Sequence, residues 1–382
     1  MDPTVSDTLA RLVAWPTVSD RPLTALAAHM AQIHEDQGFR VERFEATDLH
    51  GKVNLVASIG PPGTDGLVLS GHMDVVPTEG QPWSSDPFTV AWREGRLYGR
   101  GTADMKGFLA ATLHALARIE PGAFRRELVL VWTHDEEVGC LGSQRLATAL
   151  HAAGRTLPAA CLIGEPTDFR ILRMHPGHVG MEVVFTGRAA HSSRPDLGVN
   201  AIEAAAEAVG IVKAVASELQ EQTAHEDLLE RPWVAVNTAR IQGGSAINIV
   251  PDRCVVQIGY RPLPGMHAED VFEQIAARLH ARWGPAADAR VEARISRVTP
   301  SLLTEEGTAL QALLRPHASA PDCGAASFAT DGGNLAAIGC KPLVFGPGRI
   351  EVAHQADEYV EEAQLHQAVD VIEDVVRQQC CR

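Results

Sequence analysis

Two histidines and three carboxylates, spread widely along the sequence, form a set of candidate metal ligands: His72, Asp104, Glu137, Glu165 and His354. The set lacks a thiolate, so it suits Zn, Mn or Co in a reactive site better than a cysteine-rich structural zinc site. One ion needs only three or four protein ligands. Because the set has five members, including a short Asp that can bridge, it predicts two divalent ions about 3.5–4 Å apart.

The charges of these side chains predict what such a centre would do. Three carboxylates offset most of the four positive charges of two divalent ions. The positive remainder polarises a carbonyl group and acidifies water, which is what the hydrolysis of an amide requires.

Two neighbouring acidic residues are assigned different roles, one as a metal ligand and one as the acid–base catalyst. Glu136 and Glu137 follow an apolar segment, where successive side chains point in different directions. We assign Glu137 to a metal ion and Glu136 to general acid–base catalysis, for which burial and nearby ions would tune its pKa. Asp74 lies two residues after His72, and we expect its carboxylate to accept the second ring N–H of that histidine. The alternative for Asp74 is a turn or a helix cap.

The elements that must position these residues are short apolar segments followed by polar ones. Four segments have this form, at 67–70, 128–132, 161–163 and 342–345. If they are parallel strands, the residues after them converge at the carboxyl edge of one sheet, where ligands bind in open α/β folds. The alternative is that the acidic residues only begin the helices that follow, where the helix dipole favours them. Four segments that lead to His, Asp and Glu favour convergence.

The pattern along the chain predicts two domains, one of them in two parts. Residues 1–177 and 293–382 alternate apolar segments with helical patterns, which is typical of an α/β domain with a largely parallel sheet. Residues 178–292 differ, with half-buried strands around 181–185 and 255–258 and a long helix from Asn200 to about Leu219. They predict an inserted α+β domain.

Composition excludes several classes of function. The net charge of −15 argues against a nucleic-acid partner. The segment 1–7 lacks the features of a secretion signal, and no apolar run reaches eighteen residues, so we expect a cytoplasmic protein without a membrane segment. Seven cysteines without a CxxC pair are typical of free thiols in a reducing compartment.

Four motifs in this order resemble those of the M20 metallopeptidase family over nearly the whole chain: GHMDVVP (71–77), YGRGTADMKG (98–107), DEEVG (135–139) and GEPT (164–167). The resemblance implies that Asp104 bridges two metal ions. It further implies that His72 and Glu165 complete one site, that Glu137 and His354 complete the other, and that Glu136 is the base.

The inserted domain also resembles its counterpart in that family, which implies a homodimerisation module and lid. The segment AHSS (190–193) resembles the motif whose histidine, here His191, stabilises the oxyanion. The segments GGSAINIVPD (243–252) and YRPLPG (260–265) imply that Asn248 and Arg261 hold a substrate carboxylate. Ala329 and Asp331 stand where the family usually has Gly and Glu. Asp331 is therefore a candidate residue for recognising a distal amine on the substrate.

The expected function follows from the resemblance of GTADMKGF (101–108) and GPGRIEVAHQADEY (346–359) to the branch of the family that deacetylates N2-acetyl-L-ornithine. It is hydrolysis of that compound, or a close N-acyl amino acid, in arginine biosynthesis, with two Zn ions or Co or Mn in their place. The alternatives are a succinyl-diaminopimelate desuccinylase, an aminoacylase or a carboxypeptidase of the same family. A more distant alternative is a non-catalytic protein that binds metal or an amino acid.

Overall fold

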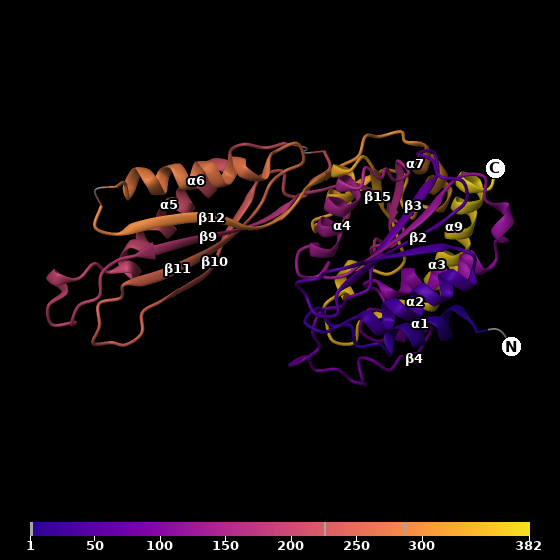
Figure 1. Cartoon of the computed structure of the whole chain (residues 1–382), viewed down its shortest axis with the longest axis horizontal. Coiled ribbons are helices and arrows are strands. Elements are labelled where there is room, and N and C mark those ends of the chain that lie inside the picture. The colour runs from indigo at the N-terminus through magenta and orange to yellow at the C-terminus, as the bar shows by residue number, and fades with distance from the viewer. Residues whose placement is uncertain (1–2, 225–226, 286) are drawn as a thin grey trace. The chain divides into compact units, whose positions relative to one another are not determined.

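A computed structural model describes residues 3–224, 227–285 and 287–382 (Figure 1). The chain divides into two compact units: the first comprises Met1–Met174, Thr304–Ala325 and Thr330–Arg382, and the second His175–Leu303 with Ala326–Ala329. The domain boundaries predicted at 177 and 292 stay predictions, and the latter falls within a strand at Arg290–Thr299. Of the segment 1–7, in which no signal was expected, residues 1 and 2 lie outside the described residues.

A mixed, largely parallel sheet forms the centre of the first unit. Its strands in this unit have the order β1–β2–β6–β3–β7–β15–β8, and β14 pairs with β8. The strands are β1 (Arg40–Glu45), β2 (Val53–Ile59), β3 (Leu67–His72), β6 (Leu128–Thr133), β7 (Ala160–Ile163), β8 (Leu172–His175), β14 (Gly324–Ala325) and β15 (Lys341–Val344). The short strand β13 (Leu302–Leu303) belongs to the second unit. The four segments expected from the sequence are β3, β6, β7 and β15, and they lie side by side in parallel. The predicted α/β class is confirmed.

Helices cover this sheet on both faces. They are α1 (Val5–Val13), α2 (Thr24–Asp36), α3 (Lys106–Ala117), α4 (Leu141–Ala152), α7 (Ala309–Leu314), α8 (Gly332–Ala337) and α9 (Glu362–Cys380). Figure 1 shows α4 on one side of the sheet and α3 and α9 on the other. Because both faces are covered, every residue of β2, β3 and β6 is buried, and these strands are mostly apolar without the alternation of a half-exposed strand.

A small antiparallel sheet of β4 (Ala91–Arg93), β5 (Arg96–Tyr98) and β16 (Tyr359–Glu361) joins two distant parts of the first unit. Tyr98 of β5 lies opposite Tyr359 of β16. This pairing brings the loop that carries Asp104 close to the segment that carries His354.

The second unit is an antiparallel sheet with two helices. The sheet has the order β10–β11–β9–β12. Its elements are β9 (His178–Thr186), β10 (Ala235–Gly243), β11 (Arg253–Arg261), β12 (Arg290–Thr299), α5 (Ala201–Gln220) and α6 (Ala268–Arg282). Burial alternates along β9 and β11, as expected for strands with one covered face. Asn200 caps α5 by accepting the N–H groups of Ile202 and Glu203, which confirms the predicted start of that helix.

None of the helices in the described ranges combines the length and apolarity that a membrane crossing requires.

Candidate metal centre

His72 is the last residue of β3, and both of its ring nitrogens have partners. Nε2 lies 2.9 Å from Oδ1 of Asp104, and Nδ1 lies 2.9 Å from the main-chain oxygen of Asp74. The side chain is 1% exposed. The ring is therefore held in one orientation, with Nε2 directed at Asp104.

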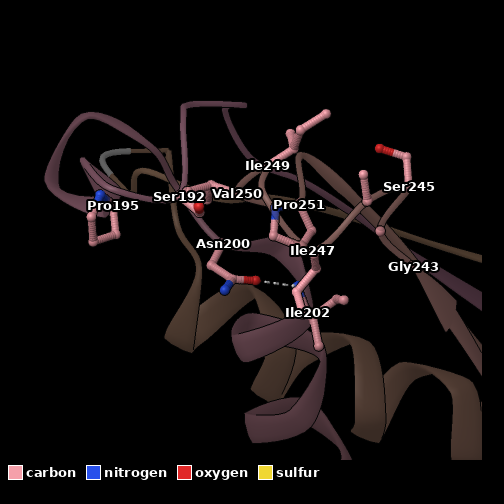
Figure 2. A pocket seen from close by; sticks show the side chains of 12 residues that line it. Ser192, Pro195, Asn200, Ile202, Gly243, Ser245, Ile247, Ile249, Val250 and Pro251 are labelled. Atoms are coloured by element: carbon pink, nitrogen blue, oxygen red, sulfur yellow. Dashed lines mark hydrogen bonds between the residues drawn. The ribbon is translucent and has the colours of Figure 1, made fainter.

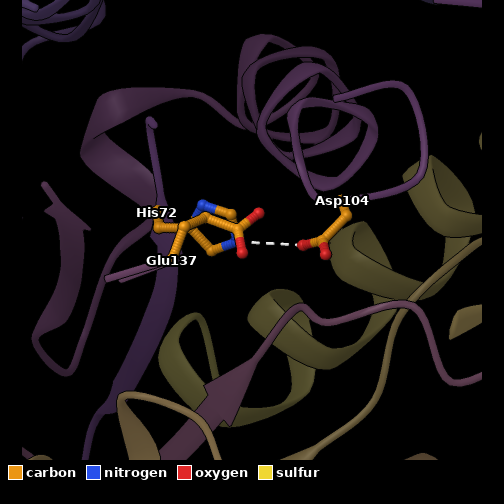
Figure 3. Close-up of side chains that lie close together, drawn as sticks. All are labelled: His72, Asp104 and Glu137. Carbon is orange, nitrogen blue, oxygen red and sulfur yellow. Dashed lines mark hydrogen bonds and ion pairs between the residues drawn. The ribbon is translucent and has the colours of Figure 1, made fainter. Parts of the chain in front are cut away.

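Asp104 lies in the loop between β5 and α3 and divides the other candidate ligands into two groups. Its Oδ1 faces His72, whose Nε2 is also 3.9 Å from Oε1 of Glu165. Its Oδ2 lies 3.2 Å from Nε2 of His354, and that nitrogen is 2.9 Å from Oε2 of Glu137. All five side chains thus come together in the first unit, at the carboxyl edge of the parallel strands, and Figure 3 shows three of them.

Two of the three carboxyl groups in this cluster, those of Glu137 and Glu165, resist ionisation. Burial, followed by the charge of Asp104, raises the pKa of Glu137 to about 7. The same two causes, in the same order, raise the pKa of Glu165 well above its ordinary value. Hydrogen bonds to Asp104 and Glu137 raise the pKa of His354 to about 10. The crowding of buried carboxyl groups around His354 therefore favours positive charge in this cluster.

Three features of this cluster suit it to divalent cations. Oε1 of Glu137 is buried and has no hydrogen-bond partner. Ligand atoms of His72, Asp104 and Glu137 all lie within 4.8 Å of one another. The donors are imidazole and carboxylate, which suit Zn, Mn and Co.

Asp74 contacts the two glutamates rather than the ring of His72. Its Oδ1 is 3.8 Å from Nδ1 of His72, too far for the hydrogen bond expected from the sequence. Instead Oδ1 accepts the main-chain N–H of Glu136 at 3.1 Å, and Oδ2 accepts that of Glu137 at 3.3 Å and the hydroxyl of Ser19 at 2.8 Å. The reason is strand pairing, since β3 and β6 are neighbours and the turn after β6 lies beside Asp74.

The turn that carries Glu136 and Glu137 is held from its other end by a buried ion pair. Asp135 has a φ of 53°, in the left-handed region that costs a non-glycine residue free energy. Nζ of Lys52 lies 2.6 Å from Oδ1 of Asp135, and both side chains are buried. Ser19 and Lys52 could not be predicted from the sequence, because neither belongs to a motif.

Glu136 has a thiol neighbour, Cys140, which was not among the predicted site residues. Sγ of Cys140 donates to Oε1 of Glu136 over 3.2 Å. Burial of the carboxyl group and the charge of Glu165 raise the pKa of Glu136 well above its ordinary value. General acid–base catalysis uses carboxyl groups whose pKa burial and neighbouring charges have raised. The four-residue spacing of Glu136 and Cys140 was the available sequence signal.

Asp331 is buried beside this turn. It is 2% exposed, and its carboxylate accepts the hydroxyl groups of Thr133 and Ser143. Burial raises its pKa. Ligand atoms of Asp331, Glu136 and Cys140 lie within 4.8 Å of one another.

The other three predicted residues lie in the second unit. His191 is exposed, and its Nδ1 is 2.8 Å from the hydroxyl of Ser193. The main-chain oxygen of Asn248 accepts the N–H of Ser192. Arg261 is the last residue of β11, and burial followed by the charge of Arg297 lowers its pKa.

A pocket of about 500 Å³ lies next to His191 and Asn248 within the second unit (Figure 2). Its walls are Ser192, Pro195, Asn200, Ile202 and the segment 243–251 without Asn248. The apolar side chain of Ile247 is fully exposed there.

The sequence model of peptidase family M20/M25/M40 matches residues 68–378. The chain belongs to this family. M20 hydrolases are metal-dependent amidohydrolases and peptidases that bind two metal ions, and the ligand cluster around Asp104 supplies candidate groups for them.

Curated M20 relatives match over nearly the full length. An acetylornithine deacetylase of Edwardsiella ictaluri is 34% identical, covering 91% of this chain and 91% of the relative. An acetylornithine deacetylase of Pasteurella multocida is 31% identical, covering 97% of this chain and 96% of the relative. Among solved structures, an M20 family metallo-carboxypeptidase from Sulfolobus solfataricus has a TM-score of 0.76 at 17% identity and covers 99% of each chain. The last likeness shows the fold alone.

Proposed function

We propose that this M20 hydrolase removes the acetyl group from N2-acetyl-L-ornithine or a close N-acyl amino acid. The observation that carries the hydrolytic chemistry is the position of Asp104, whose two oxygens face different histidines. The choice of substrate is supported by two curated relatives, 31% and 34% identical, that are acetylornithine deacetylases.

The proposed ligands form two sets that share Asp104. His72 and Glu165 would hold one ion with it, and Glu137 and His354 the other. When bound, two such ions polarise the amide carbonyl and acidify the attacking water.

Glu136 is the proposed general base. Its carboxylate takes a proton from the water whose oxygen attacks the amide carbon, and it returns that proton to the nitrogen as the C–N bond breaks. The products are acetate and the free amine. The raised pKa of Glu136 supports both transfers. Cys140 holds one oxygen of the carboxylate, which leaves the other for water.

Residues of the second unit are proposed to recognise the substrate. His191 would donate to the oxygen that becomes negative as the amide carbon is attacked. Arg261 and Asn248 would hold the α-carboxylate of the amino acid, since a guanidinium group binds a carboxylate with two parallel hydrogen bonds. Asp331 stays the candidate for a distal amine, although Thr133 and Ser143 already donate to its carboxylate.

We also propose that the chain forms a homodimer through the second unit. Strand β10 lies at the edge of its sheet and is mostly exposed, which leaves main-chain groups available to a second copy. Exposed Ile241 and Ile247 would be covered by such contact. Mixing the inactive variants His191→Ala and Glu136→Gln tests whether His191 acts across the dimer. Recovery of activity in mixed dimers supports it, and no recovery contradicts it.

The substrate assignment is tested by initial rates on N2-acetyl-L-ornithine, N-acetyl-L-methionine, N-succinyl-diaminopimelate and a dipeptide with Zn, Co and Mn. We expect the highest kcat/KM for acetylornithine, and Asp331→Asn to lower it only for substrates with a cationic side chain. A preference for acetylmethionine would identify a general aminoacylase. A preference for the succinyl compound or the dipeptide would identify one of the other two activities.

A further inference from the structure

A buried ion pair holds the main chain at Asp104. Glu358 is fully buried, and its Oε1 accepts the N–H groups of Ala103 and Asp104 at 2.9 and 3.0 Å. Its Oε2 lies 2.6 Å from Nη1 of Arg100, whose side chain is 1% exposed. Removing either partner would leave a buried charge without compensation, so this pair fixes the loop that carries the proposed bridging ligand.

The side chain of Gln81 forms a hydrogen bond with the arginine of this pair. Its Oε1 accepts Nη2 of Arg100 at 2.6 Å and the indole N–H of Trp83 at 3.1 Å. Trp83 also lies against the guanidinium group of Arg100, 5.1 Å from it to the ring centroid. Because two donors point at the same atom, that atom must be the amide oxygen, and the amide nitrogen must face the other way.

The amide nitrogen of Gln81 reaches a second proposed ligand. Nε2 donates to the main-chain oxygen of His354 over 2.8 Å. His354 has a φ of 62°, in the left-handed region, and its side chain is 50% exposed, whereas those of the other four ligands are at most 6% exposed. Surrounding side chains therefore restrain His354 less than the other ligands. The hydrogen bond from Gln81 to its main chain accordingly matters more for its position.

We propose that Gln81 is a positioning residue that ties the main chain of His354 to the Arg100–Glu358 pair behind Asp104. It would set the distance between the two ligands and tighten binding of the ion held by His354 and Glu137. This inference rests on the proposed metal centre. Partners behind a metal ligand change metal affinity by roughly tenfold to a hundredfold when they are lost.

The test is a stepwise titration of metal-free protein with Zn by calorimetry, repeated with Co and followed by its visible absorption. Gln81→Met removes the hydrogen bonds but keeps the length of the side chain. The matched control is Gln355→Met. Gln355 follows His354 directly in the chain, and its side-chain amide also donates to a main-chain oxygen, but to that of Glu351 rather than that of His354. Thermal unfolding of the metal-free proteins reports whether each variant folds.

We expect Gln81→Met to weaken the binding of one of the two ions by roughly tenfold or more and to alter the visible spectrum of Co bound at that site. The affinity for the other ion, and both affinities in the control variant, should stay unchanged. Equal affinities in wild type and Gln81→Met would overturn the inference while leaving the metal centre intact. Equal weakening of both ions, or the same loss in Gln355→Met, would also overturn it. A wild-type chain that takes up fewer than two ions would overturn the metal centre and this inference with it.

If Gln81→Met does not fold, Gln81→Glu replaces it. A glutamate keeps the oxygen that accepts from Arg100 and Trp83 but cannot donate to His354. The added negative charge favours cations, so weaker binding of one ion in this variant would support the inference strongly. Unchanged or tighter binding would overturn it.

Discussion

The carboxylate of Asp74 accepts the main-chain N–H of Glu136 over 3.1 Å, from a position 62 residues earlier in the chain. The same carboxylate accepts the N–H of Glu137 and the hydroxyl of Ser19. Asp74 therefore connects the strand that carries His72 to the turn that carries the proposed base and one proposed ligand.

Asp74→Asn should lower kcat by roughly tenfold to a hundredfold with little change in KM. An amide presents one acceptor oxygen, and its NH2 group would face a main-chain N–H that needs an acceptor. Ser19→Ala is the matched control, since it removes one donor and leaves both N–H contacts. Steady-state kinetics of the two variants provide the measurement. An Asp74→Asn enzyme with wild-type kcat would show that this contact does not position the turn.

Glu136→Gln should lower kcat by about 10²–10⁴ while the metal content stays unchanged, because it removes a proton acceptor and no ligand. Glu137→Gln should instead lose metal, since Glu137 is a proposed ligand with a buried, unpartnered oxygen. Metal analysis of both purified variants alongside their kinetics separates the two roles. If Glu136→Gln were the variant that loses metal, the assignments of the two glutamates would have to be exchanged.

Arg261→Ala should lower kcat/KM by roughly two to three orders of magnitude for substrates with a free α-carboxylate. Deleting one side of a buried charge pair costs about 2–5 kcal/mol, and about 1.4 kcal/mol corresponds to a factor of ten. Arg253→Ala is the control, because Arg253 lies at the exposed other end of β11. N-acetylputrescine, which has the amine but no carboxylate, should be hydrolysed equally by wild type and Arg261→Ala. An equal loss on that compound would contradict carboxylate recognition.

A buried histidine should make the metal-free protein less stable in weak acid. Burial lowers the pKa of His34 from 6.5 to about 4, and its Nε2 accepts the indole N–H of Trp132. The unfolded chain therefore binds more protons between those two pH values, so stability falls as the pH drops below about 6.5 and stops falling near pH 4. The contribution amounts to about 3 kcal/mol at most.

Urea unfolding of the metal-free protein at pH 7 and pH 5 measures this effect. His34→Gln keeps an acceptor for Trp132 but does not titrate, so its free energy of unfolding should fall less between the two pH values than that of wild type. His29→Gln, at an exposed position of the same helix, should behave as wild type does. Identical pH dependence in all three proteins would contradict the assignment to His34.

Much of the fold and the proposed ligand set could be predicted from the sequence, for a physical reason. Strands covered on both faces are continuously apolar, and residues that follow parallel strands meet at one edge. That rule placed His72, Glu137 and Glu165 together. The segment 342–345, which is β15, leads to His354 under the same rule. Asp104 follows no such simple rule, since a loop positions it, and its motif carried the prediction.

The contacts behind the ligands could not be predicted in the same way. Asp74 was expected to contact His72, its neighbour in sequence, but it contacts a turn that only strand pairing brings close. Gln81 and Glu358 likewise join segments far apart in the chain. Such hydrogen bonds depend on how distant segments pack, so the spacing of residues in the sequence does not predict them.

An activity titration tests most directly whether two metal ions share Asp104. Metal-free protein is given increasing Zn, and bound metal and the rate of acetylornithine hydrolysis are measured at each step. We expect two tightly bound ions per chain, with the rate rising until the second is bound, and loss of both tight sites in Asp104→Asn. Full activity at one ion per chain, with no gain from a second, would contradict this expectation.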